Sequence, residues 1–79
     1  MATKISIKCK NSASKSVEFY PNGGREDDVM VFVLQNGEFW FALDNNYCNL
    51  KNAKRAAIKK MAKMGYTFDD TEMENLNWK

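Results

Sequence analysis

The sequence predicts an α+β fold, in which an antiparallel three- or four-stranded sheet is followed by one helix packed on one face and by a C-terminal tail. Three observations lead to this prediction. The first half of the chain contains short runs in which apolar and polar residues alternate, which is the period of a half-buried strand. An Asn-Gly pair at 36–37 separates two apolar runs, as in a two-residue hairpin turn. Residues 50–64 then place apolar side chains at helical spacing.

The length of 79 residues predicts one small domain, residues 1–79. A hydrophobic content of 44%, with 13% aromatic residues, is typical of a folded chain rather than a disordered one. Within this domain we expect strands at about 4–10, 15–20, 28–35 and 38–44, a helix at about 50–64 and a tail at 66–79.

The first two strands follow from alternation. In KISIKCK, residues 4–10, the apolar side chains Ile5, Ile7 and Cys9 share one side, and the other side is polar and mostly lysine. Alternation resumes in KSVEFY, residues 15–20, so we expect a hairpin. Residues 21–28, PNGGREDD, hold the only proline and a Gly-Gly pair, which predicts a loop.

The third and fourth strands flank Asn36-Gly37, and both of their faces are apolar. A regular two-residue turn places Gln35 opposite Glu38 and Val33 opposite Trp40. One face then carries Met30, Phe32, Leu34, Phe39, Phe41 and Leu43. The other carries Val31, Val33 and Trp40, a candidate apolar binding face, because one helix covers only one side of the sheet. Alternatively, the tail covers that face or two copies of the chain pair there.

The helix is expected to begin after Asn49, whose side chain can cap it, and to end before Gly65, which suits a left-handed position. Its apolar stripe, which we expect to pack on the sheet, is Leu50, Ala53, Ala57, Met61 and Met64. The tail is expected either to form a short helical turn beginning at Asp69 or Asp70, or to lie extended across the open face of the sheet.

The chemistry-bearing residues argue against an enzyme. The chain has no histidine, and Cys9 and Cys48 lie too far apart for a common zinc-ligand spacing, so we expect no metal, no cofactor and two small buried thiols. The acidic loop at 25–28 lacks the spacing of a calcium loop, and a chain this short hardly encloses a catalytic pocket. No apolar run approaches the roughly 18 residues of a membrane helix, so we expect a cytoplasmic protein without membrane contact.

The helix also carries a row of positive charges, Lys51, Arg55, Lys59 and Lys63, spaced four residues apart. Like charges at this spacing are mildly destabilising unless something compensates for them. A nucleic-acid backbone would do so, and so would the acidic side chains of the tail. The basic row is therefore a candidate binding site.

Residues 51–57, KNAKRAA, partly resemble the last helix of the double-stranded-RNA-binding domain, whose pattern is close to KKxAKxxAA. Lys51, Ala53, Lys54 and Ala57 match this pattern, whereas Leu50 and Ile58 depart from it. That family also begins with a helix, and this chain begins with an expected strand. The resemblance implies a nucleic-acid-binding module that uses the basic helix.

The chain as a whole, Lys/Asn-rich and combining a sheet with one helix, resembles the small accessory proteins of bacteriophages, including anti-CRISPR and other host-takeover inhibitors. That resemblance implies a non-enzymatic protein that binds and masks a host macromolecular complex, with defence or regulatory machinery as the partner. The expected location is then the host-cell cytoplasm. The alternatives of a monomer and a homodimer both stay open, as does nucleic-acid binding.

Overall fold

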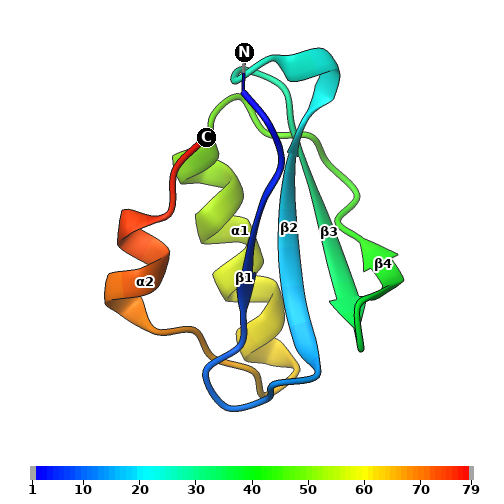
Figure 1. Cartoon of the computed structure of the whole chain (residues 1–79), viewed down its shortest axis with the longest axis vertical. Coiled ribbons are helices and arrows are strands. Elements are labelled where there is room, and N and C mark those ends of the chain that lie inside the picture. The colour runs from blue at the N-terminus through cyan, green and yellow to red at the C-terminus, as the bar shows by residue number, and fades with distance from the viewer. Residues whose placement is uncertain (1, 79) are drawn as a thin grey trace.

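The chain forms one four-stranded antiparallel sheet with two helices in the part that the computed structural model describes, residues 2–78 (Figure 1). Met1 and Lys79, the ends of the expected domain and tail, lie outside the described residues. The strands follow the order β1-β2-β3-β4, which confirms the predicted α+β class. The bounds are β1 Ile5–Lys8, β2 Lys15–Pro21, the short 3-10 turn η1 Asn22–Gly24, β3 Val29–Gln35, β4 Glu38–Ala42, α1 Leu50–Lys63 and α2 Asp70–Asn75.

Both helices pack on the same face of the sheet. Figure 1 shows β1 crossing in front of α1, with α2 beside them. The core joins the inward side chains of β1, β2 and β3 to α1 and to Phe68 and Met73 of the tail, and Leu76 and Trp78 pack against it. The tail therefore does not lie across the opposite face. That face, which we call the open face, is covered by no element among residues 2–78.

The first helix forms largely as its sequence predicts. The Asn49 side chain accepts a hydrogen bond from the Asn52 amide at 2.8 Å, which satisfies one of the free donors of the first turn. Leu50, Ala53, Ala57 and Met61 are buried against the sheet, as predicted. The prediction for Met64 is wrong: it is exposed because the helix ends there and Gly65 takes the chain through a φ of +90°.

The hairpin between β3 and β4 contains a bulge that the sequence did not predict. Asn36 and Gly37 both have positive φ, which confirms the expected turn. Leu34 pairs with Phe39, but Val33 pairs with Phe41, so Trp40 has no partner in the register. The predicted pairing of Val33 with Trp40 is therefore wrong. An extra residue in one strand moves the following side chains to the other face, and Phe41 packs against the core.

The start of the tail is tied to the β1–β2 loop, and the helix within the tail is capped locally. The Asn11 side chain donates to the Gly65 carbonyl at 2.9 Å and accepts from the Thr67 amide at 3.0 Å, which joins the β1–β2 loop to the chain after α1. The Asp69 side chain accepts from the Glu72 amide at 2.9 Å and caps α2. Of the two expected arrangements of the tail, the short helix is the one that forms.

Candidate binding surfaces

The predicted apolar binding face, Val31, Val33 and Trp40, does not exist as one surface. Val31 and Val33 are 1% and 0% exposed, because they point toward α1 and form part of the core. Their assignment to an uncovered face is wrong. Trp40 is 40% exposed, but the bulge separates it from the two valines.

The exposed apolar surface of the sheet lies instead on the open face. It consists of the exposed rings of Tyr20 on β2 and Phe39 on β4, and of three half-buried side chains on β3, Met30, Phe32 and Leu34. Register makes the group continuous, since Tyr20 pairs with Met30 and Leu34 pairs with Phe39. Three rings connect it further: Phe32 lies edge-on to Tyr20 at 6.1 Å and to Phe39 at 6.0 Å between centroids. We call Tyr20, Phe32 and Phe39 the aromatic row.

Polar side chains border the aromatic row on the side of β1. The Lys4 ammonium lies 3.3 Å from a Glu18 carboxylate oxygen, and Glu18 pairs with Phe32 across the strands. Ser6 and Lys8 continue this border and are exposed. The open face thus has an apolar centre on β3 and a polar, partly paired margin. Tyr20 at 42% and Phe39 at 65% exposure present most of the accessible ring surface.

All four residues of the basic row are exposed on α1. Within residues 2–78, no ion pair joins any of them to a carboxylate. The acidic tail is held in another way: the Lys54 ammonium donates to the backbone carbonyls of Glu74 and Leu76, near the end of α2. Burial lowers the pKa of Lys54, and the charge of Glu74 opposes that shift. The alternative in which the tail's carboxylates pair with the basic row is therefore not what forms.

The basic row is divided between two grooves that differ in their acidic lining. Lys51 and Arg55 line a groove of about 500 Å³ between α1 and α2, together with Lys54 and the carboxylates of Asp70 and Glu74. We call this the helix–helix groove.

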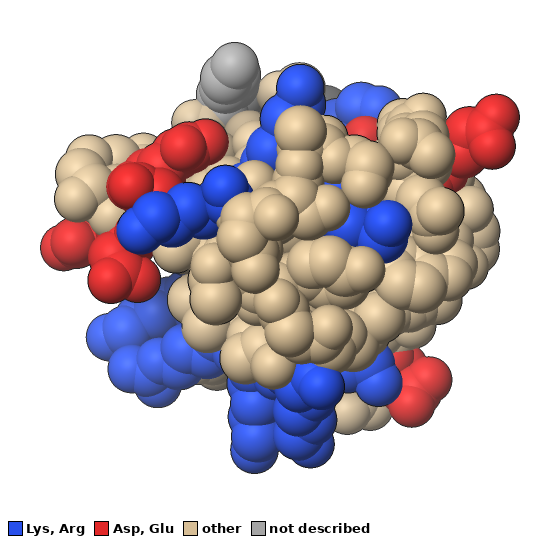
Figure 2. Space-filling view, turned by 90° about the horizontal axis from the view of Figure 1, so that it is seen from below, with Lys and Arg blue, Asp and Glu red and all other residues tan. Residues whose placement is uncertain are grey.

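The second groove, of about 440 Å³, lies between β4 and α1, and we call it the basic groove. Lys59 and Lys63 line it with Lys60, a third lysine from outside the row. Phe41 and Tyr47 also line it, and Asp44 is its single carboxylate. Figure 2 views the end of the molecule at which α1 finishes, and blue side chains project together along its lower margin.

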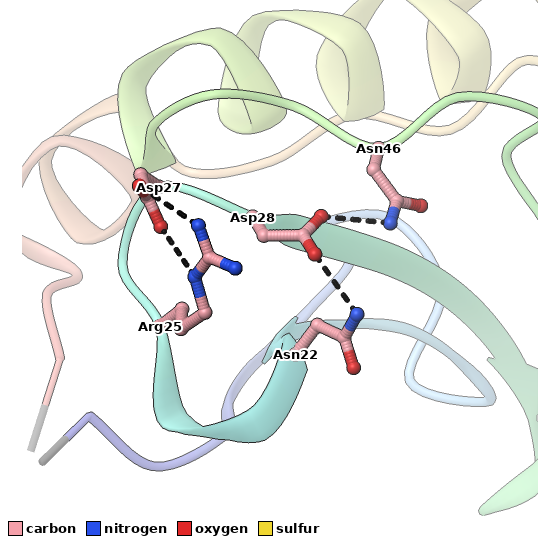
Figure 3. Close-up of polar contacts among 5 residues, drawn as sticks. All are labelled: Asn22, Arg25, Asp27, Asp28 and Asn46. Atoms are coloured by element: carbon pink, nitrogen blue, oxygen red, sulfur yellow. Dashed lines mark hydrogen bonds and ion pairs between the residues drawn. The ribbon is translucent and has the colours of Figure 1, made fainter.

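The acidic loop is held by internal hydrogen bonds (Figure 3). Asp28 accepts from the side-chain amides of Asn22 at 2.9 Å and Asn46 at 2.8 Å, and these bonds lower its pKa. Arg25 donates two hydrogen bonds to Asp27, at 3.1 and 3.3 Å. The carboxylates of Asp27 and Asp28 are therefore engaged in hydrogen bonds within the chain. No group of three metal-ligating side chains occurs in residues 2–78.

Both cysteines are free thiols, but only one is buried. Cys9 lies in the core, and burial raises its pKa. Cys48 is exposed just before α1, so the expectation of two buried thiols is wrong for that residue.

Comparisons with known proteins return no relative. A scan against protein-family models, a search of curated proteins and a search of solved structures each found no match. In residues 2–78, no helix has the length and apolar content needed to cross a membrane. The open face and the two grooves are therefore the candidate binding surfaces of the chain.

Proposed function

We propose that this chain is a non-enzymatic binding module whose open face contacts a partner protein. The observation that carries the proposal is the aromatic row, in which Phe32 on β3 lies against both Tyr20 on β2 and Phe39 on β4, on the open face of the sheet. Single exposed apolar side chains are common on protein surfaces, whereas a contiguous group typically marks an interaction site.

The composition of the open face favours a protein over a nucleic acid. Aromatic side chains and methionine are enriched at the centre of protein interfaces, and charged residues are depleted there. Met30, Phe32 and Leu34 form such a centre here. The lysines of this face, Lys4 and Lys8, lie on its border along β1, and Lys4 already pairs with Glu18, so the apolar centre itself offers no positive charge to a phosphate backbone.

The resemblance to small phage accessory proteins extends this proposal. A chain of 79 residues without histidine suits stoichiometric binding better than acid–base catalysis. On this reading, the open face seats on a host protein complex of the defence or regulatory machinery and masks a functional site, as an anti-CRISPR-like inhibitor does. The module would act in the host-cell cytoplasm.

The test is a comparative affinity capture from host lysate with three baits: the natural chain, Phe39→Ser and Ile58→Ser. Phe39 is exposed on the open face, and Ile58 is an equally apolar, exposed residue on α1 that serves as the matched control. We expect a partner that is retained by the natural chain and by Ile58→Ser and is lost by Phe39→Ser.

Two results would contradict the proposal. In one, the captured protein is lost by Ile58→Ser and retained by Phe39→Ser. In the other, sedimentation shows that the natural chain self-associates and that Phe39→Ser makes it monomeric, which would assign the open face to a second copy of this chain.

A second candidate function is nucleic-acid binding through α1. The absence of ion pairs on the basic row in residues 2–78 favours it, because the charges stay available to an external anion. Anisotropy of a labelled oligonucleotide at about 50 mM and about 200 mM salt tests it, since phosphate contacts weaken steeply with salt.

A further inference from the structure

We propose that the basic groove between β4 and α1 binds the phosphate backbone of a single-stranded nucleic acid, and that Trp40 stacks on a base at its margin. This inference rests on the second candidate function and assigns it a site and a ligand class. It uses only half of the basic row and adds residues from the sheet.

The charges of the two grooves select one of them. Three lysines, Lys59, Lys60 and Lys63, line the basic groove against the single carboxylate of Asp44. The helix–helix groove is also lined by three cations, but two carboxylates, Asp70 and Glu74, line it as well and repel phosphate. A polyanion that approaches α1 therefore meets excess positive charge at the end where the helix finishes.

Aromatic rings lie beside these lysines. Phe41 lines the basic groove, with the Lys60 ammonium 5.7 Å from its ring centroid. The ring of Trp40 lies 5.1 Å from that of Phe41, and the Lys15 ammonium lies 5.4 Å from the Trp40 ring. Two lysines thus flank a pair of aromatic rings from α1 across β4 to β2. Positive charge beside aromatic rings is the combination used to hold single strands.

The bulge explains why Trp40 is available for stacking. Without it, Trp40 would pair with Val33, on the core side of the sheet. The extra residue puts Phe41 opposite Val33 and leaves Trp40 partly exposed at the margin of the sheet.

The size of the groove and its aromatic margin favour a single strand over a duplex. A volume of about 440 Å³ suits one or two nucleotides. Stacking on Trp40 requires a base that is not stacked on its neighbours. The bases of a duplex are paired and stacked, so they do not meet this requirement. An acidic peptide would contact the lysines but would not stack on Trp40. The Trp40→Ala variant and competition with polyglutamate distinguish such a peptide from a nucleic acid.

The experiment measures the anisotropy of a labelled oligothymidylate, and of a labelled duplex of equal length, with five proteins. They are the natural chain, Lys59→Gln/Lys63→Gln, Lys51→Gln/Arg55→Gln, Trp40→Ala and Trp78→Phe. The two double variants remove equal charge from the same exposed row, so they are matched. Glutamine keeps helix propensity close to that of lysine and arginine.

We expect the natural chain to bind the single strand more tightly than the duplex. Lys59→Gln/Lys63→Gln should weaken binding by about 10- to 100-fold at about 50 mM salt and lower the logarithmic salt slope by about 1.4, for two lost contacts. Lys51→Gln/Arg55→Gln should change affinity by less than about threefold. Trp40→Ala should weaken binding by about fivefold to hundredfold, and Trp78→Phe should not.

Five results would overturn the inference. Absence of single-strand binding at about 50 mM salt would remove the second candidate function as well. Equal losses in the two double variants would leave nucleic-acid binding intact but assign it to the whole helix. Equal affinity for duplex, or an unchanged affinity in Trp40→Ala, would exclude stacking. Displacement of the oligonucleotide by polyglutamate at an equal charge concentration would indicate a general polyanion or acidic-peptide site.

Discussion

Phe32 lies edge-on to Phe39, with ring centroids 6.0 Å apart, on the sheet face that no element within residues 2–78 covers. Edge-to-face geometry of this kind is favourable between aromatic rings and orders both side chains before any partner arrives. A preordered apolar surface loses less conformational freedom on binding, which is a common route to affinity. The pair therefore forms the centre of the proposed protein contact.

The two faces of the sheet should respond differently to substitution. Val33→Ala removes two methyl groups from a fully buried position and should lower the free energy of unfolding by about 2 kcal/mol. Phe39→Ser acts on an exposed ring and should cost less than about 1 kcal/mol. Urea unfolding of both variants measures the difference. Equal costs would contradict the assignment of Phe39 to the open face.

The Asn11 side chain should hold the tail to the sheet. Asn11→Ala removes one hydrogen bond to the Gly65 carbonyl and one from the Thr67 amide, and should cost about 1–2 kcal/mol. Hydrogen exchange at the Thr67 amide should accelerate in this variant. Asn45→Ala, in the exposed β4–α1 loop, is the control and should change neither quantity. Unchanged exchange at Thr67 in Asn11→Ala would show that α2 docks without this tie.

The hydrogen bonds from the side-chain amides of Asn22 and Asn46 to Asp28 should make the stability of the fold depend on pH in the acidic range. They lower the pKa of Asp28 below its ordinary value of 3.8, so the folded state binds the proton less readily than the unfolded state. The stabilisation is therefore fully present above pH 3.8 and is lost as pH falls through the lowered pKa.

Thermal melts of the natural chain and Asp28→Asn from about pH 7 to about pH 2 test this linkage. The natural chain should be more stable at neutral pH, and the difference between the two should close in acid. Glu26→Gln removes one negative charge from the same loop and serves as the control. A stability difference that stays constant down to about pH 2 would contradict the role given to Asp28.

The Lys54 side chain should anchor the end of α2. Lys54→Met keeps an unbranched stem against Leu76 but leaves the carbonyls of Glu74 and Leu76 without this donor. We expect a loss of about 1 kcal/mol in unfolding free energy and faster hydrogen exchange in α2. Lys51→Met is the control, because Lys51 is an exposed lysine one turn earlier on α1. If the two variants behave alike, the Lys54 contacts do not stabilise the tail.

The local features of the fold were predictable because short stretches of sequence determine them. Asn49 caps α1, Asn36 and Gly37 take the positive φ values of their turn, and Gly65 follows the helix end, all as expected from residue chemistry. The stripe from Leu50 to Met61 likewise follows from helical periodicity alone.

The choice of covered face was not predictable from the β3–β4 hairpin, because both of its faces are apolar. The discriminating signal lies in β2, where Val17 and Phe19 pair with Val33 and Val31, while Ser16 and Glu18 align with the opposite face. The pattern of β2, aligned with β3 and β4, therefore distinguishes the open face from the covered one. The bulge at Trp40 has no such signal, because a shift of one residue still leaves apolar side chains on both faces.

The central claim is that the open face binds a protein through the aromatic row. The direct measurement is calorimetric titration of the purified captured partner with the natural chain, Phe39→Ser and Ile58→Ser. We predict that Phe39→Ser raises Kd by at least about 30-fold, as expected for a hot-spot ring, and that Ile58→Ser stays within about twofold of the natural chain. A Kd for Phe39→Ser within about twofold of the natural value would contradict the account.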